Sequence, residues 1–200
     1  MPSKRRKRNA PLTRKAILGA AEKLFAQNGF NGVSMRDLSR LSGISQPLIH
    51  HHFGTKEALY QAVKQRAMDQ FKTVWPSTGA GRDILGRLQT AARNIFTKLV
   101  DDRKLLRLSS WTRLEDGNEL WPGEDRMMEQ LRGELVAAQK AGELRRDVDP
   151  LLMAIMLEAL ICFWCEERLR LKALFKDWVG VDERYLREMW KVLERGMKVR

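Results

Sequence analysis

The stretch that decides the fold is Gly43-Ile44-Ser45-Gln46-Pro47-Leu48-Ile49-His50-His51-His52-Phe53-Gly54-Thr55-Lys56-Glu57. Its start predicts a tight turn and then a helix, because serine caps helices and proline is tolerated in a first helical turn. Gly54 ends that helix, which therefore spans residues 46–53. Upstream, Ser34 and Asp37 have capping-box spacing and predict a short helix ending at Gly43. A helix, a glycine turn and a second short helix are the pattern of a helix-turn-helix.

The predicted helix 46–53 has an apolar face and a polar face. Ile49 and Phe53 are four residues apart and are expected to pack inward with Ile44. The outward residues are Gln46, Pro47, His50 and His51, flanked by Leu48 and His52. Glutamine and histidine can hydrogen-bond base edges or phosphates, and apolar side chains can contact a thymine methyl group. This face therefore fits the major groove of DNA better than it fits solvent.

Lys56 follows in the first turn of the next expected helix, which Thr55 can cap. A cation there is opposed by the positive end of the helix dipole, so it needs compensation. A DNA phosphate would be favoured by both the lysine and the free backbone amides, and we expect a phosphate contact at Lys56. The alternative is a solvated lysine. The three histidines are not expected to hold a metal, because successive helical side chains diverge and cannot converge on one ion.

Three segments together resemble the N-terminal DNA-binding part of the tetracycline-repressor (TetR) family. They are Gly32 to Leu38, Gly43 to Ser45 and Leu48 to Glu57, within about residues 12–63. The resemblance implies that helix 46–53 enters the major groove, that Lys56 contacts a phosphate, and that Ser34 and Arg36 approach the phosphate backbone. Two positions depart from the family pattern: His50 replaces a more usual tyrosine, and Leu48 replaces an often small or hydroxylated residue. The operator sequence therefore cannot be inferred from the family.

The positive charge of this 200-residue chain is concentrated at one end. Residues 1–75 hold 14 Lys/Arg against 4 Asp/Glu, whereas residues 76–200 hold 23 against 21, within a total of +12. This distribution indicates a polyanion as partner, nucleic acid before membrane, because the basic end lacks a long apolar anchor. Residues 1–10 have no apolar stripe and are expected to form a flexible basic arm that either reaches DNA or only aids solubility.

The sequence predicts an all-α protein, because apolar residues recur at helical spacing and no segment alternates like a strand. The first four helices are expected from Thr13 to Gly29, within 34–43, over 46–53, and from Thr55 to Trp75-Pro76. Later helices are expected near 82–100, 103–114, 125–141, 150–174 and 183–198. The predicted domains are the arm (1–10), a helix-turn-helix DNA-binding domain (11–58) and a helical ligand-binding and dimerisation domain (59–200).

Residues 151–165 are apolar almost all round, but a membrane span would need about 20 such residues. One side of this helix is expected to face its own core and the other a second subunit. The last helix carries a further apolar stripe of Tyr185, Leu186, Met189, Trp190, Leu193 and Met197. As in the resembled family, the last two helices are expected to form a homodimer interface whose paired DNA-binding domains read a palindromic operator. Burial of these stripes within one chain is the alternative.

The C-terminal domain of the resembled family also holds a ligand pocket. The expected contacts here are Trp111, Trp121, Glu158 and Phe163, each of which has an ordinary core position as the alternative. Glu158 needs a partner in its apolar run: a ligand cation, an arginine across the dimer, or water. Cys162 and Cys165 are expected to be two buried thiols in a cytoplasmic, nucleoid-associated protein, because no secretory leader precedes them.

We therefore expect a sequence-specific transcriptional regulator, a repressor that leaves a palindromic operator when a small-molecule effector shifts its conformational population. No catalytic residue and no cofactor are expected, because the chain lacks a phosphate-binding loop, a dinucleotide glycine pattern, a nucleophile elbow and zinc-ligand spacing. The alternative function is an architectural or division-control DNA-binding protein that recruits a protein partner through its C-terminal domain.

Overall fold

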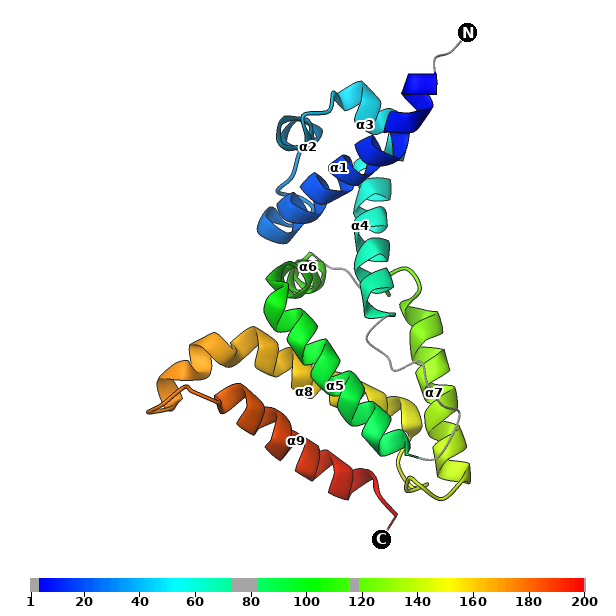
Figure 1. The fold of residues 1–200 in the computed structure, drawn as a ribbon, viewed down its shortest axis with the longest axis vertical. Helices are drawn as coiled ribbons and strands as arrows, with labels where there is room; N and C mark the ends of the chain where they lie inside the picture. The colour runs from blue at the N-terminus through cyan, green and yellow to red at the C-terminus, as the bar shows by residue number, and fades with distance from the viewer. Residues whose placement is uncertain (1–3, 73–82, 116–118, 200) are drawn as a thin grey trace. The chain divides into compact units, whose positions relative to one another are not determined.

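The computed structural model describes residues 4–72, 83–115 and 119–199, and within these ranges the regular elements are helices (Figure 1). They are α1 Lys4–Asn28, α2 Met35–Ser42, α3 Gln46–Phe53, α4 Lys56–Phe71, α5 Ile84–Asp101, α6 Arg103–Leu114, α7 Glu124–Lys140, α8 Pro150–Leu171, the short 3-10 helix η1 Lys172–Leu174 and α9 Val181–Met197. The all-α prediction is confirmed, and α3 has the expected bounds. The expected end of the fourth helix at Trp75-Pro76 lies outside the described residues.

The first helix begins earlier than expected. The backbone of α1 is helical from Lys4, although the sequence predicted a start at Thr13 and a flexible arm before it. Pro11 lies inside this helix, where its backbone nitrogen can donate no hydrogen bond. The prediction took the missing apolar stripe as a sign of disorder, but lysine and arginine are good helix formers and can extend a helix that is already packed. The predicted helix start at Thr13 was therefore wrong, whereas the flexibility of residues 1–10 and their contact with DNA stay predictions.

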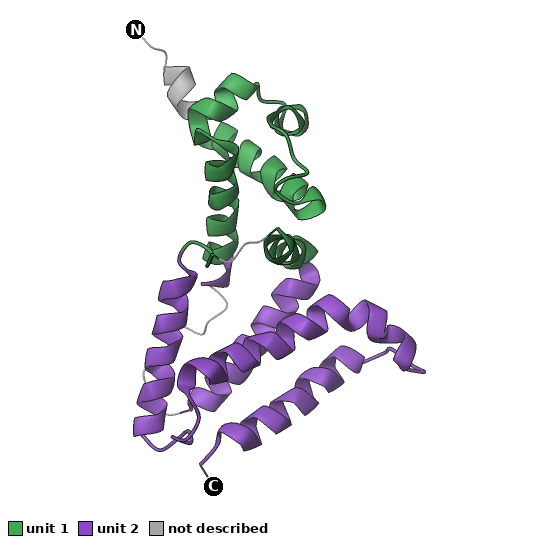
Figure 2. Cartoon of the chain, turned by 180° about the vertical axis from the view of Figure 1, so that it is seen from behind, with its two compact units in different colours: residues 1–69, 103–122 green, residues 70–102, 123–200 purple. Residues whose placement is uncertain are grey.

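The chain divides into two compact units (Figure 2). Unit 1 comprises Met1–Asp69 and Arg103–Pro122, and unit 2 comprises Gln70–Asp102 and Gly123–Arg200. The predicted boundary after residue 58 differs from this division, because most of α4 and the whole of α6 belong with the N-terminal helices. Unit 1 is thus assembled from two separate stretches of sequence.

In unit 1, α1 packs against both α2 and α6. Fully buried side chains come from every helix of the unit: Ile17, Phe25, Leu38, Ile49, Leu59, Val63 and Leu108. The core also holds the carboxylate of Glu22, a residue that is only 9% exposed. Its oxygens lie 2.8 Å from Lys104 Nζ and 3.7 Å from Arg66 Nη1. Cations from α6 and α4 therefore compensate the buried charge.

In unit 2, α5, α7 and α8 pack against one another, and α9 packs against α5 and α8. One side of α8 is buried, as predicted, through Met153, Ala154, Leu157, Ile161, Trp164 and Cys165. The stripe of α9 is also buried inside this unit through Leu186, Met189, Trp190 and Met197. The prediction that this stripe faces a second subunit was therefore wrong, since periodicity shows that a face is buried but does not show against which chain.

Polar and aromatic contacts join the end of α8 to the start of α9. The Trp164 indole N–H donates to Asp182 Oδ1 over 2.9 Å, and the Trp164 ring stacks on Tyr185 with centroids 4.1 Å apart. Arg168 also donates to the Asp182 carboxylate. Burial opposes ionisation of Asp182, but the hydrogen bonds from Arg168 and Trp164 and the Arg168 charge outweigh it, so the pKa of Asp182 is lowered. None of the described helices is long and apolar enough to cross a membrane.

Candidate nucleic-acid interface

The capping box at the start of α2 is present as predicted. Ser34 Oγ accepts the Asp37 backbone N–H over 3.2 Å, and the Asp37 carboxylate accepts the Ser34 backbone N–H over 3.0 Å. The Ser34 hydroxyl also donates to that carboxylate. These bonds, with the charge of Arg40, lower the pKa of Asp37. Gly43 ends α2 with a φ of 69°. This conformation favours glycine and makes the turn to α3 short.

The faces of α3 match the sequence prediction. Ile49 is 0% exposed and anchors the helix, while Ile44 and Phe53 are half-buried. Five of the six α3 residues predicted to contact DNA are exposed: Gln46, Pro47, Leu48, His50 and His51. His52 is half-buried, with its ring centroid 5.6 Å from that of His51. The structure thus presents the polar face to solvent, and its contact with DNA stays a prediction.

The ends of α3 are fixed by contacts that partly follow the prediction. Ser45 occupies the N-cap, but its side chain makes no capping hydrogen bond, contrary to the expected capping function. At the other end, His50 Nδ1 lies 2.6 Å from the Gly54 carbonyl oxygen. Nδ1–H therefore donates, and the second ring nitrogen, Nε2, stays outside that bond. Thr55 caps α4 as predicted, since Thr55 Oγ1 accepts the Ala58 N–H over 3.1 Å.

Lys56 has partners that the sequence did not predict. Its ammonium group donates to the backbone carbonyls of Phe30 and Val33 over 3.1 and 3.0 Å, and lies 4.1 Å from the centroid of the Phe30 ring. These acceptors supply the compensation for which the sequence argument invoked a phosphate. Of the other two residues predicted near the DNA backbone, Arg36 is exposed, and Ser34 is engaged in the capping box.

A second set of contacts, missed by the sequence reasoning, holds the same region from α6 and from Glu115, the residue that follows it. The Glu115 carboxylate accepts the backbone N–H groups of Phe30 and Asn31 over 2.8 and 2.9 Å. Arg107 donates to the Ala26 and Gln27 carbonyls, at the end of α1, over 2.7 and 3.1 Å. These partners lie 80–85 residues apart in the chain. No local sequence signal reports contacts of this kind.

Among the described residues of unit 2, α8 carries a row of exposed apolar side chains. We call it the α8 apolar face; its residues are Leu152, Ile155, Met156, Leu160 and Phe163. They recur at helical spacing on the side of α8 opposite its buried residues. The structure therefore confirms that α8 has two apolar sides, one of which packs inside unit 2.

The four predicted ligand contacts do not form one site in either unit. Trp111 and Trp121 are half-buried residues of unit 1, whereas Glu158 and Phe163 are exposed residues of α8 in unit 2. Partial desolvation, and then the Glu124 carboxylate, raise the pKa of Glu158. Trp111 lies against the α1 terminus, because a Cβ built on Gly29 would come within 2.8 Å of its ring.

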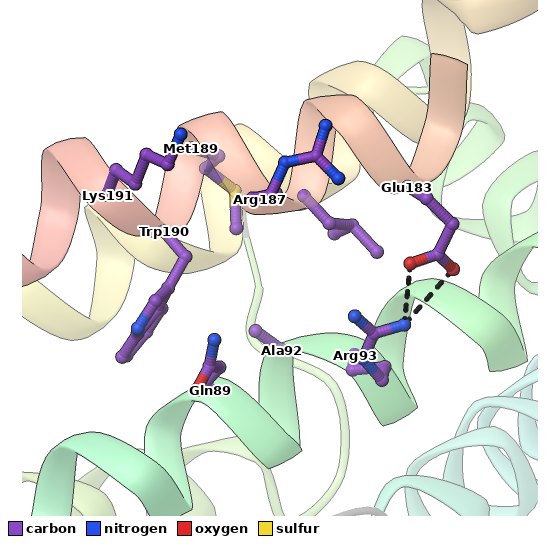
Figure 3. Close-up of a pocket in the computed structure, with 9 residues that line it drawn as sticks. Gln89, Ala92, Arg93, Glu183, Arg187, Met189, Trp190 and Lys191 are labelled. Atoms are coloured by element: carbon purple, nitrogen blue, oxygen red, sulfur yellow. Dashed lines mark hydrogen bonds and ion pairs between the residues drawn. The ribbon is translucent and has the colours of Figure 1, made fainter. Parts of the chain in front are cut away.

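A pocket of about 370 Å³ lies between α5 and α9 and includes none of these four residues (Figure 3). Arg93 donates to Glu183 across it over 2.8 Å, and the other lining residues include Trp190, Arg187 and Lys191. The residues that the structure describes contain no group of three or more histidine, cysteine or acidic side chains placed to hold a metal ion. Burial raises the pKa of Cys165 to about 12, so its thiol is protonated at neutral pH.

The short turn between α2 and α3, and the exposed polar face of α3, define unit 1 as a helix-turn-helix unit. Comparison with known protein families narrows the class of protein further. A profile of bacterial regulatory proteins of the tetR family matches residues 17–63, and one of the tetracyclin repressor-like C-terminal domain matches residues 88–185. The chain belongs to the tetR family of bacterial regulatory proteins.

Individual relatives agree with this assignment. The chain is 41% identical over 64 residues to the HTH-type transcriptional regulator UidR of Escherichia coli K12, covering 30% of this chain and 33% of UidR. It is 31% identical over 134 residues to RutR of the same strain, another HTH-type transcriptional regulator, covering 66% of this chain and 59% of RutR. The matches thus span about a third and about three fifths of these relatives. The structure of SCO4942 from Streptomyces coelicolor shares the fold, with a TM-score of 0.76, 20% identity, and coverage of 92% and 98% of the two chains.

Proposed function

We propose that this protein is a sequence-specific transcriptional repressor that leaves a palindromic operator when a small molecule binds to its C-terminal helices. The observation that carries the proposal is the exposed face of α3, where Gln46, His50 and His51 offer hydrogen-bonding groups beside apolar Pro47 and Leu48. Such a mixture is suited to base edges and thymine methyl groups in a major groove. Membership of the tetR family and the named functions of UidR and RutR support the same function.

The proposal includes a homodimer formed through the α8 apolar face. Five large apolar side chains on this face are between 38% and 54% exposed in the single chain. A contiguous apolar patch of this kind marks an interaction surface, because its burial removes apolar area from water. A second copy of the chain is the proposed occupant, since a two-fold axis through matching faces would pair two DNA-binding units for a palindromic site.

An effector works through its difference in affinity between the DNA-binding and the released conformations. Trp111 and Trp121 in unit 1 and Glu158 in unit 2 stay separate candidate contacts, each within its own unit, whereas Phe163 is assigned to the α8 apolar face. We place the protein in the cytoplasm, at the nucleoid, where its DNA partner lies.

DNA binding is tested with the purified full chain on the intergenic DNA upstream of its own gene and on shuffled DNA of equal length. Both are titrated at the same near-physiological salt, because protein–DNA affinity depends steeply on salt. We expect a preference of about a thousandfold for the upstream DNA. Gln46→Ala and His51→Ala should each reduce that preference while the circular dichroism spectrum stays unchanged.

Equal binding to both DNAs, unchanged in the two variants, would refute sequence-specific recognition of that region. Genome-wide mapping of bound sites then separates the two candidate functions. A few sites near promoters indicate a regulator. Many dispersed sites, together with a protein partner held by the C-terminal helices, would favour the architectural function instead.

A further inference from the structure

The loop between α1 and α2, residues 29–33, is held from two sides by charged side chains. On one side, the carboxylate of Glu115, the residue directly after α6, accepts the Phe30 and Asn31 N–H groups. On the other, the Lys56 ammonium of α4 donates to the Phe30 and Val33 carbonyls. Hydrogen bonds in which one partner is charged are stronger than neutral ones, so four such bonds restrain this short loop. The loop leads directly into Ser34, the N-cap of α2.

The packing leaves little freedom for Glu115 to move without the loop. Gly29 is buried and has a φ of 71°. A Cβ built on it would lie 2.6 Å from Glu115 Oε1 and 2.8 Å from the Trp111 ring, so α6 is in close contact with the end of α1. Arg107, on the same helix, is bonded to the last carbonyls of α1. Arg107 and Trp111 of α6 and the following Glu115 therefore form one contact surface.

The segment that carries Glu115 is connected at both ends to unit 2. The segment Arg103–Pro122 belongs to unit 1, but the residues before and after it belong to unit 2. It follows α5 after the single residue Asp102. Within unit 1, the segment after Asp102 therefore carries Glu115, whose carboxylate holds the loop that leads into α2.

We infer that Glu115 is a positioning residue for DNA recognition: its carboxylate sets the loop 29–33 and, through it, the placement of α2 and α3. This inference rests on the proposed function, because it assigns the regulation of that same site. It concerns a residue directly after α6 that belongs to none of the predicted DNA or ligand contacts.

The test compares Glu115→Gln and Glu115→Asp with Glu119→Gln as a matched control. Glu119 is an exposed carboxylate further along the same segment, for which the described part of the chain shows no bond. In wild type each Glu115 oxygen accepts a different N–H, so Gln can satisfy only one of them. Asp keeps the charge but has a shorter reach. Amide exchange measured by NMR reports the loop directly, without DNA.

We expect amide exchange at Phe30 and Asn31 to become about tenfold faster in both Glu115 variants, with no change in α8 or in the control. Affinity for the specific DNA should fall by about the same factor, while affinity for shuffled DNA changes less than twofold. The direction of the change in DNA affinity is diagnostic for Glu115→Gln, because removing a negative charge by itself would strengthen DNA binding. Glu119→Gln should therefore bind slightly more tightly than wild type or equally well.

The inference is overturned if exchange at these two amides matches the control, or if specific and shuffled DNA lose affinity equally in the Glu115 variants. A wild-type chain without any DNA preference would instead refute the proposed function. In that case, amide exchange at Phe30 and Asn31 alone decides whether Glu115 holds the loop. Unchanged exchange in the Glu115 variants would refute that contact function as well.

Discussion

Replacing Lys56 by methionine separates two explanations of this residue. The substitution keeps most of the aliphatic chain and removes the ammonium group. In the structure that group makes hydrogen bonds of 3.1 and 3.0 Å to the Phe30 and Val33 carbonyls and lies over the Phe30 ring. If these contacts are its main function, the variant loses stability. If a DNA phosphate is its main partner, the free protein is unaffected.

The expected loss follows from the two hydrogen bonds and the ring contact. A hydrogen bond to a charged group contributes about 1.5–3 kcal/mol, and an exposed cation–π contact about 0.5–1 kcal/mol. Lys56 is only half-buried, so water can reach the Phe30 and Val33 carbonyls that lose their partner. The lower end of each energy range therefore applies. We expect the free energy of unfolding to fall by about 3.5 kcal/mol for Lys56→Met, from two charged hydrogen bonds and one cation–π contact at the lower end of their ranges.

Urea unfolding followed by circular dichroism measures this change. Lys23→Met is the control, because Lys23 is an exposed lysine of α1 in the same unit. The salt dependence of DNA binding is measured on the same proteins. A stability within about 0.5 kcal/mol of the control, together with a salt slope shallower by about 0.9, would refute the structural explanation and assign Lys56 to a phosphate.

Three further predictions concern unit 2. Phe163→Arg should convert a dimer into a monomer in sedimentation velocity, because it puts a charge on the α8 apolar face. Leu174→Arg, at a residue 76% exposed outside that face, should not; the same oligomeric state for both would contradict the proposed interface. Cys165 should resist alkylation in the native protein at about pH 8, because burial raises its pKa to about 12; rapid labelling of both thiols would show that this part of α8 is open. Asp182 has a lowered pKa, so its stabilising effect is present above its ordinary value of 3.8 and is lost as the pH falls through the lowered value. Asp182→Asn should accordingly be less stable than wild type at neutral pH, and urea unfolding at decreasing pH should show the difference shrinking below about pH 4; a constant difference would contradict the ion pair.

Local signals predicted the DNA-binding helices well. Gly43 and Gly54 end helices through backbone conformations that favour glycine, and such signals depend only on neighbouring residues. The spacing of Ile49 and Phe53 then gave the orientation of α3, and Ile49 is fully buried as a result. The exposed face of the candidate interface could therefore be predicted before any tertiary contact was known.

Contacts between distant residues could not be predicted in the same way. The partners of Lys56 and Glu115 are backbone groups far away in sequence, and backbone groups carry no sequence signature. The prediction that the α9 stripe faces a second subunit was wrong for a related reason, because periodicity does not distinguish a neighbouring helix from a second subunit. The proposed ligand contacts were chosen for residue type alone, and the structure distributes them over both units.

The position of α6 in unit 1 has a consequence for protein synthesis. The ribosome completes α1 to α4 before any of α6 exists, and α5 must emerge in between. Until Lys104 arrives, Glu22 lacks one of its two cations and the α6-facing side of α1 is uncovered. The nascent DNA-binding unit is therefore incomplete for a longer time than its N-terminal location implies, which favours chaperone contact. A fragment that retains the whole of unit 1 must accordingly include residues 103–122, joined to residue 69 by a linker in place of α5.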